Sequence, residues 1–336
     1  MNEALLFQKY KSTYESAFSD LSIHLFLLWA GFHITYLFRE SYTCILPITF
    51  LSFMLSRTFV VFHDCGHGSY VPNKQLNYLI GSILGIFVAT PFSWNCTHHN
   101  HHLTSGNIEN ELQYQASETI YHTVTQYQEM SPIARTLYRV MRNPFIYHTL
   151  APIIYWGINQ RYSVLTTKLQ GVPFDESVAR ICFDLVVSNT GIFLLGRTLY
   201  TYGILTHWIA ALWLSGVATM GIFHNEHVFN PPYMVKSHEW TQRASGLVGS
   251  SLICFPEWFK RFMSGIEYHH IHHMNAKIPG RNLRAYHEEV VANSTLFDNV
   301  VHLSLRDCLS NTWLCLYDES SGRFVSCAEA DSMKCE

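Results

Sequence analysis

Residues 42–69 read YTCILPITFLSFMLSRTFVVFHDCGHGS, an apolar run that leads directly into a pair of histidines. A helix that crosses a bilayer needs roughly 20 predominantly apolar residues. Tyr42–Phe62 meets that requirement, so we predict a membrane span that is followed at once by His63 and His67. Arg57 lies within this span, where a charge at mid-bilayer costs about 2.5–3.5 kcal/mol, and it should therefore lie near an interface or face a partner.

Three further stretches resemble spans in length and hydropathy, and with Tyr42–Phe62 they form two pairs with short connections. These stretches are Leu21–Phe38, Phe183–Tyr200 and Gly203–Phe223. We predict an all-α, multi-pass membrane protein with about four transmembrane helices in two hairpins. Two more apolar runs, 76–94 and 145–158, are interrupted by glycine or proline, which favours interfacial or buried segments over spans. Four crossings place both termini and every histidine cluster on one face.

Composition supports a membrane protein whose histidine-bearing face is cytosolic. Charged residues make up only 14% of the chain, against about 25% in an average soluble domain. The formal net charge of −3 implies no broad basic face, which argues against a nucleic-acid partner. All but Arg39, Arg57 and Arg197 of the 22 Lys and Arg fall on the predicted histidine side, which the positive-inside rule identifies as the cytosol. The nine cysteines include no CxxC pair, which indicates reduced thiols.

The histidines themselves form three clusters, in HDCGH (63–67), CTHHNHH (96–102) and EYHHIHHMN (267–275). Spacings of three and four place side chains on one face of a helix. The candidate metal ligands on this basis are His63, His67, His98, His101, His102, His269, His272 and His273. Neutral imidazole suits Zn, Cu, Fe and Ni, and eight ligands exceed the four of a structural zinc site, so two metals fit the count better. His99 and His270 interrupt the pattern and should face away from the metals.

The sequence lacks the common motifs of metalloproteases, nucleotide-binding proteins and dinucleotide-binding enzymes, which argues against these classes. No HExxH, Walker or GxGxxG motif occurs. Histidine clusters at a membrane face favour iron and oxygen chemistry on a lipid. The sequence also lacks a haem, flavin or ferredoxin pattern, so we expect electrons from a separate carrier, either ferredoxin or cytochrome b5.

The order HxxxH, HxxHH, HxxHH and its flanking residues resemble the membrane fatty acid desaturase family. HDCGHGS, PFSWNCTHHNHHLTSGN and EYHHIHHMNAKIPGRNL are similar to acyl-lipid desaturases of the oleate (delta-12) type, and the likeness runs from about residue 50 to YDESSGRFV near the C-terminus. The resemblance implies a cytosolic cap with two non-haem Fe ions. It further implies a reaction that uses O2 and two electrons to remove two hydrogens from a lipid-linked acyl chain and leave a cis double bond.

The family usually supplies one more histidine after the last span, in a segment resembling QHxFE. Here the segment reads FHNEHVFN, in which His227 matches the family position and His224 is the runner-up. Glu226 stands where glutamine is usual, and Asn230 where an acid is usual. Metal-bound imidazoles normally donate their other N–H to an oxygen acceptor, and the candidates for that role are Asp64, Glu226, Glu267 and Asn275.

The resemblance predicts a cytosolic N-terminal segment (1–20), a desaturase domain (21–310) and a cytosolic C-terminal tail (311–336). The membrane would be the endoplasmic reticulum in a eukaryotic host and the inner membrane in a bacterium. Two other reactions on the same scaffold remain open, namely hydroxylation of a fatty acyl chain and ketolation or hydroxylation of a carotenoid. A more remote alternative is a membrane protein that binds metal without catalysis.

Overall fold

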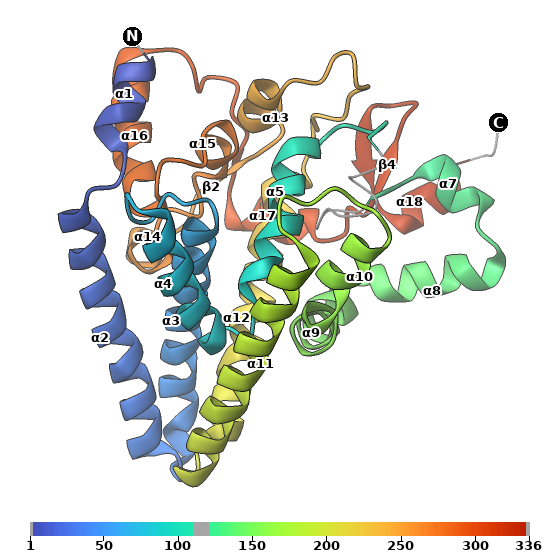
Figure 1. The fold of residues 1–336 in the computed structure, drawn as a ribbon. Coiled ribbons are helices and arrows are strands. Elements are labelled where there is room, and N and C mark those ends of the chain that lie inside the picture. The colour runs from blue at the N-terminus through green and yellow to red at the C-terminus, as the bar shows by residue number, and fades with distance from the viewer. Residues whose placement is uncertain (1–2, 111–120, 334–336) are drawn as a thin grey trace.

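The computed structural model describes residues 3–110 and 121–333 and is predominantly helical. Four helices are long and apolar enough to cross a membrane. They are α2 (Tyr14–Phe38), α3 (Ile45–Gly66), α11 (Val178–Thr201) and α12 (Leu205–His227). In Figure 1 these helices run together toward the bottom of the view, and the shorter elements gather around their upper ends. The four predicted spans therefore correspond to the four long helices.

Short helices and strands complete the described chain. The helices are α1 (Glu3–Tyr10), η1 (Tyr42–Cys44), α4 (Lys74–Phe87), η2 (Phe92–Trp94), α5 (Asn95–Thr104), α7 (Val124–Glu129), α8 (Pro132–Arg142), α9 (Pro144–Gly157), η3 (Asn159–Arg161), α10 (Ser163–Leu169), α13 (Gln242–Val248), α14 (Glu257–Met263), α15 (His269–Met274), α16 (Gly280–Asn293), α17 (Leu305–Asn311) and α18 (Cys327–Ser332). The strands are β1 (His122–Thr123), β2 (Leu252–Ile253), β3 (His302–Leu303), β4 (Leu316–Asp318) and β5 (Arg323–Val325). They form a three-stranded sheet in the order β1-β4-β5 and a parallel β2-β3 pair, which the all-α prediction did not include.

Helix α3 is the central member of the four long helices. Two thirds (67%) of its apolar 18-residue stretch is buried inside the protein, against 22% of the corresponding stretch of α2. It packs against α2, α4 and α12, and Leu51, Met54 and Leu55 on it are fully buried. The other long helices leave large apolar side chains such as Trp29 on α2 and Phe193 on α11 exposed, as expected for helices that face lipid.

Two polar side chains within the long helices, Arg57 and His24, have partners on a neighbouring helix. Arg57 forms an ion pair with Asp20 of α2, so it faces a partner, which is one of the two placements that the sequence allowed. His24 Nε2 lies 3.1 Å from Thr58 Oγ1 in the contact between α2 and α3. These pairs satisfy groups that would otherwise be costly to bury in an apolar environment.

The apolar run at residues 76–94 is sharply bent and forms no straight span. Helix α4 and the segment Phe92–Thr104 meet at 105° across a short break. Ala89 in this break has a positive φ of 52°. A Cβ at Gly85 would lie 2.4 Å from the carbonyl oxygen of Thr90, so the tight return of the chain requires glycine there. The bend brings α5 back toward the C-terminal end of α3.

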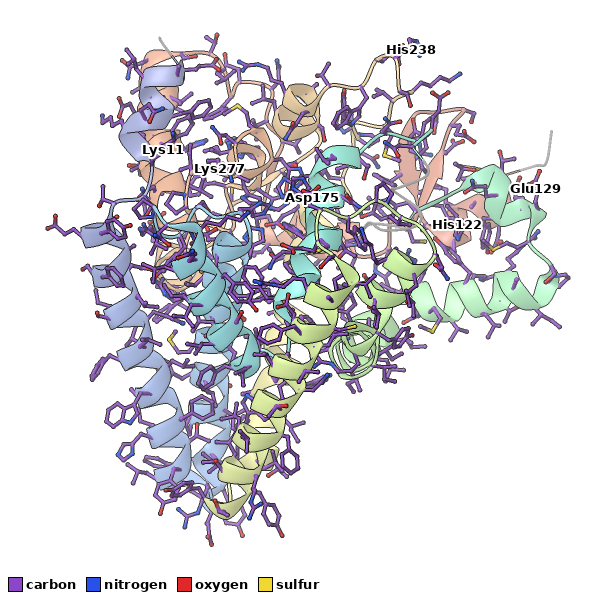
Figure 2. The ribbon with its side chains drawn as sticks, viewed as in Figure 1. Lys11, His122, Glu129, Asp175, His238 and Lys277 are labelled. Carbon is purple, nitrogen blue, oxygen red and sulfur yellow. The ribbon has the colours of Figure 1, made fainter. Side chains whose placement is uncertain are left out.

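The polar part of the molecule surrounds the upper ends of the long helices. The side chains labelled in Figure 2, among them Lys11, His238 and Lys277, all lie in the upper half of the view. Helix α1 and helix α18, close to the two ends of the chain, also lie there (Figure 1). The expected C-terminal tail contains β4, β5 and α18, and buried Leu316, Val325 and Ala330 pack these elements against α7.

Candidate metal centre

Four short stretches of the chain present the clustered histidines. His63 lies in the last turn of α3, and His67 caps that helix. Helix α5 carries the second cluster, and the six-residue helix α15 carries the third. His227 is the last residue of α12. Since each stretch is helical, the spacings of three and four residues place the side chains of one cluster on one side of its helix.

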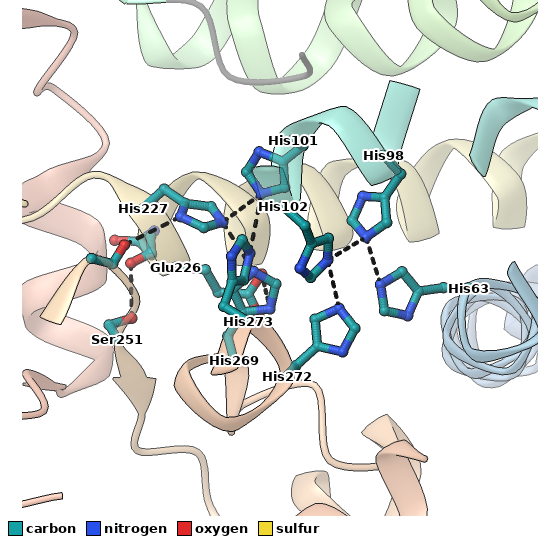
Figure 3. Close-up of polar contacts among 12 residues, drawn as sticks. His63, His98, His101, His102, Glu226, His227, Ser251, His269, His272 and His273 are labelled. Carbon is teal, nitrogen blue, oxygen red and sulfur yellow. Dashed lines mark hydrogen bonds and ion pairs between the residues drawn. The ribbon is translucent and has the colours of Figure 1, made fainter. Parts of the chain in front are cut away.

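The structure brings nine histidines together in two groups. The first group is His63, His67, His98, His102 and His272, and the second is His101, His227, His269 and His273. Within each group one nitrogen of every ring lies within 4.8 Å of the others. Figure 3 shows the imidazoles of the second group and those of His63, His98, His102 and His272 from the first group pointing toward one another from α3, α5, α12 and α15. All nine histidines singled out as candidate ligands belong to one of these groups.

Helices α5 and α15 each contribute to both groups. His101 belongs to the second group, although its neighbour His102 belongs to the first. The rings of His102 and His273 are 4.1 Å apart, so the two groups adjoin. Each HxxHH motif thus divides its side chains between two neighbouring positions. Such an arrangement suits two metal ions held side by side in one protein pocket.

The nitrogen atoms converge in a way that hydrogen bonds alone do not explain. His98 Nε2 lies 2.8 Å from His63 Nε2 and 3.1 Å from His102 Nε2, and His102 Nε2 lies 3.0 Å from His272 Nε2. A neutral imidazole has one N–H and one lone pair, so several converging lone pairs repel unless a cation lies between them. His67 Nε2 is buried and has no hydrogen-bond partner within the described chain. The residues therefore fit a bound metal.

Burial keeps these side chains in the form that binds metal. It lowers the pKa of His269, His272 and His273 well below the ordinary value of 6.5, with nearby histidines adding to the effect. Neutral imidazole is the metal ligand, because a protonated ring has no free lone pair. A shell made of imidazole nitrogens suits Fe as well as Zn, Cu and Ni.

Two carboxylates lie beside the Nδ1 atoms of two of these rings, on the side opposite the converging Nε2 atoms. Glu226 Oε2 lies 3.4 Å from His269 Nδ1, and Asp64 Oδ1 lies 3.5 Å from His63 Nδ1. The other Asp64 oxygen accepts a hydrogen bond from the Gly280 N–H at 2.7 Å, which fixes the carboxylate in place. Both acids were candidates for orienting the imidazoles, and their positions fit that role.

The other two candidates lie differently. Glu267 is buried, and burial raises its pKa to about 7. Asn275 Oδ1 accepts a hydrogen bond from the Lys277 N–H, which forms a local turn. Sequence reasoning missed the carbonyl of Gly249, which lies 3.3 Å from His227 Nδ1. A backbone carbonyl carries no signal in the sequence, so only the fold identifies it.

The remaining histidines near the clusters point elsewhere. His224 Nε2 lies 3.0 Å from the carbonyl oxygen of Asn311, outside both groups, whereas His227 lies inside the second group. His99 is exposed, and His270 is buried with its Nε2 3.3 Å from His287 Nδ1. These placements agree with the expectation that His99 and His270 face away.

An apolar cavity of about 140 Å³ adjoins both histidine groups. His63 and His98 of the first group and His269 of the second line it together with Glu226. The rest of its wall consists of Phe59, Val60, Trp94, Tyr147, Tyr155, Trp156, Thr219, Met220, Ile222, Phe223, Met263 and Ile266. Trp94 stacks on His98 with ring centroids 4.8 Å apart, and its Nε1 donates to the Tyr155 hydroxyl at 2.7 Å.

Comparison with known proteins agrees with the architecture of this centre. The family model described as fatty acid desaturase matches residues 40–301. The chain is 27% identical over 310 residues to a fatty acid desaturase of Bacillus subtilis, covering 90% of this chain and 81% of the relative. It is 28% identical over 258 residues to an sn-1 oleoyl-lipid 12-desaturase of Synechocystis, covering 74% and 69%.

A plant relative extends the comparison. The temperature-sensitive sn-2 acyl-lipid omega-3 desaturase (ferredoxin) of Arabidopsis thaliana chloroplasts is 26% identical over 238 residues, which cover 67% of this chain and 51% of the relative. The family match spans most of the chain and includes every histidine of the two groups. The protein therefore belongs to the fatty acid desaturase family and is an oxidoreductase.

Proposed function

We propose that this protein is an O2-dependent desaturase that introduces a cis double bond into a lipid-linked acyl chain. The observation that carries the proposal is the apolar cavity that touches both histidine groups. An acyl chain in this cavity would lie against His63 and His98 on one group and His269 on the other. An unactivated methylene offers no polar handle, so the protein must select it by position.

The nine grouped histidines are the proposed ligands of two iron ions. The first group would hold one ion with up to five imidazoles, and the second group would hold the other with four. When bound, the two iron ions would supply, with O2 and two external electrons, the oxidising power that removes two hydrogens from the acyl chain. Asp64 and Glu226 would orient His63 and His269 through their Nδ1 atoms.

The residues of the cavity wall would hold the substrate and exclude water. Phe59, Val60 and Ile222 supply apolar contact surface, and the stacked Trp94 forms part of the wall beside His98. Exclusion of water protects a reactive centre from side reactions. Hydroxylation and carotenoid ketolation would use the same site, but the relatives described above are all desaturases, which favours desaturation.

The proposed membrane arrangement has two helical hairpins and a cytosolic cap. Helices α2 and α3 are joined through η1 and pack against each other, and α11 and α12 follow each other directly and also make contact. This topology would place the histidine groups beside the membrane surface, where an acyl lipid could enter. Electrons would come from a separate carrier, ferredoxin or cytochrome b5, and the name of the plant relative supports ferredoxin.

Fatty acid analysis of a heterologous host tests this function. Expression of the chain should produce a new cis-unsaturated fatty acid in membrane lipids, and His101→Ala should abolish it. His99→Ala is the matched control, because the exposed His99 is on the same helix and outside both groups. A hydroxy acid or an altered carotenoid in place of the new double bond would redirect the proposal to the other reactions. An unchanged lipid profile with folded, membrane-inserted, metal-loaded protein and a working electron donor would refute it.

A further inference from the structure

The C-terminal part of the chain brings two cysteines into contact. Cys315 precedes β4, and Cys327 is the first residue of α18, after β5. The Cys315 N–H donates to the Val325 carbonyl at 3.0 Å, which continues the antiparallel pairing of β4 with β5. The hairpin thereby holds the two side chains on the same side, with their Sγ atoms 3.2 Å apart.

The distance between the sulfurs favours a dithiol over a metal site. Two thiolates that share a tetrahedral zinc ion lie roughly 3.8 Å apart, since each Zn–S bond is about 2.3 Å. A disulfide bond of about 2 Å needs only a small further approach from 3.2 Å. In residues 3–110 and 121–333, the groups of three or more potential metal ligands are the two histidine groups, and neither includes these cysteines.

A cavity gives small solutes access to this pair. It measures about 250 Å³, and Arg139, Arg142, Asn143 and Trp313 line it together with both cysteines. Cys315 is buried and Cys327 is partly exposed. A molecule of the size of hydrogen peroxide can therefore reach the sulfur atoms without unfolding of the hairpin.

The surroundings of the two thiols make them unequal. The hydrogen bond with Cys327 lowers the pKa of Cys315, and the positive charge of Arg142 lowers it further. The same contact raises the pKa of Cys327. The thiolate is the nucleophilic form, and Cys315 lines the cavity together with Arg142, so Cys315 is placed to attack an electrophile there with the Cys327 thiol beside it.

We propose that Cys315 and Cys327 form a redox-active dithiol that hydrogen peroxide converts into a disulfide. The Cys315 thiolate attacks one oxygen of peroxide, the O–O bond breaks, and a sulfenic acid forms while the other oxygen leaves as hydroxide, which takes up a proton to give water. The Cys327 sulfur then attacks the Cys315 sulfur and displaces its hydroxyl group. This hydroxyl group takes up the Cys327 proton and leaves as a second water molecule. Two thiols are oxidised by two electrons, and one peroxide is reduced. The proposal stands apart from desaturation and does not depend on it.

Peptide mapping of the intact protein tests this assignment. The full-length metal-loaded protein in detergent is reduced, freed of reductant and exposed to one equivalent of hydrogen peroxide, and then alkylated and digested without reductant. We expect a linked peptide pair containing Cys315 and Cys327, with a mass lower by two hydrogens and reversible by dithiothreitol. Cys327→Ser and Cys315→Ser should each abolish the linked peptide, and Cys327→Ser should leave a sulfenic acid on Cys315 that dimedone traps.

Matched controls separate a specific pair from general oxidation. Cys308→Ser removes a cysteine of α17 outside the pair and should leave the linked peptide unchanged. Wild-type protein unfolded in guanidinium should lose the preference for this pair, because the hairpin no longer holds the sulfurs together. Folding of each variant is checked by size-exclusion chromatography. If a variant misfolds, the loss of alkylation at Cys315 and Cys327 of the wild-type protein, followed over time after peroxide addition, tests the proposal instead. The proposal is overturned if both thiols stay alkylatable while Cys308 oxidises, or if folded protein links either one to a different cysteine.

Discussion

Replacing His101 with alanine should remove about one metal ion per chain, whereas replacing His67 should remove much less. His101 is one of four imidazoles in the second group, so its loss leaves three protein ligands. His67 is one of five in the first group, so its loss leaves four, as many as the intact second group has. The position of His101 reinforces the difference, since its Nε2 lies 3.0 Å from His227 Nε2 and 3.2 Å from His273 Nε2.

The magnitude of the effect follows from the role of a direct ligand. Removing a residue that only orients a ligand weakens metal binding by about 10–100-fold, so loss of a ligand from a four-member group should exceed about 100-fold, or roughly 2.7 kcal/mol. At that cost a chelator wash that leaves the wild type loaded should strip the second position of the His101→Ala protein. The same wash should leave the His67→Ala protein close to the wild-type metal content.

Metal content per chain, measured by inductively coupled plasma mass spectrometry before and after the wash, checks this prediction. His99→Ala should match the wild type, because His99 is exposed and outside both groups. Equal metal loss in the His67 and His101 variants would refute the division into five and four ligands. Full metal content in the His101 variant would refute the second site itself.

Three further predictions follow from the same geometry. Glu226→Ala should weaken metal binding by about 10–100-fold in a competition titration with a chelator, because it removes the oxygen that lies 3.4 Å from His269 Nδ1; unchanged affinity would exclude the orienting role. Val60→Trp should block the cavity and reduce product formation in the host at least 10-fold with metal content unchanged, since Val60 lines the wall and a larger side chain forces overpacking. The free energy of unfolding of the metal-free protein should fall as pH drops through about 6.5. The reason is that the unfolded chain then binds protons, whereas the buried imidazoles of α15, whose pKa is lowered, stay neutral. Urea titrations at several pH values measure this dependence, and a free energy of unfolding that rises as pH falls would contradict it.

The sequence predicted those features that depend on residues close together in the chain. Hydropathy over about 20 residues predicts a span, and the four predicted spans correspond to α2, α3, α11 and α12. The ends of these helices depend on other interactions. Helix α2 begins at Tyr14, before the predicted start at Leu21, because Thr13 caps it with a capping box to Ser16.

Some features depend on contacts between segments that are far apart in the chain. The short parallel pairing of His122 with Leu316 joins residues on either side of two long helices, and nothing local predicts it. The bend between α4 and α5 depends on the fit of Gly85 against Thr90. The cavity wall combines α3, α9, α12 and α14 with the residues around Trp94, so its lining could not be identified from the sequence.

By itself, the spacing of the sequence determined that eight histidines would be presented on helix faces near the ends of apolar spans, and the family resemblance added His227. The spacing did so because helical periodicity fixes which side chains share a face within one segment. Only the tertiary structure decided that His101 and His102, adjacent in the chain, belong to different groups. That division arises because α3, α12 and α15 approach α5 from different directions, and the partner of each imidazole is set by which helix end packs beside it.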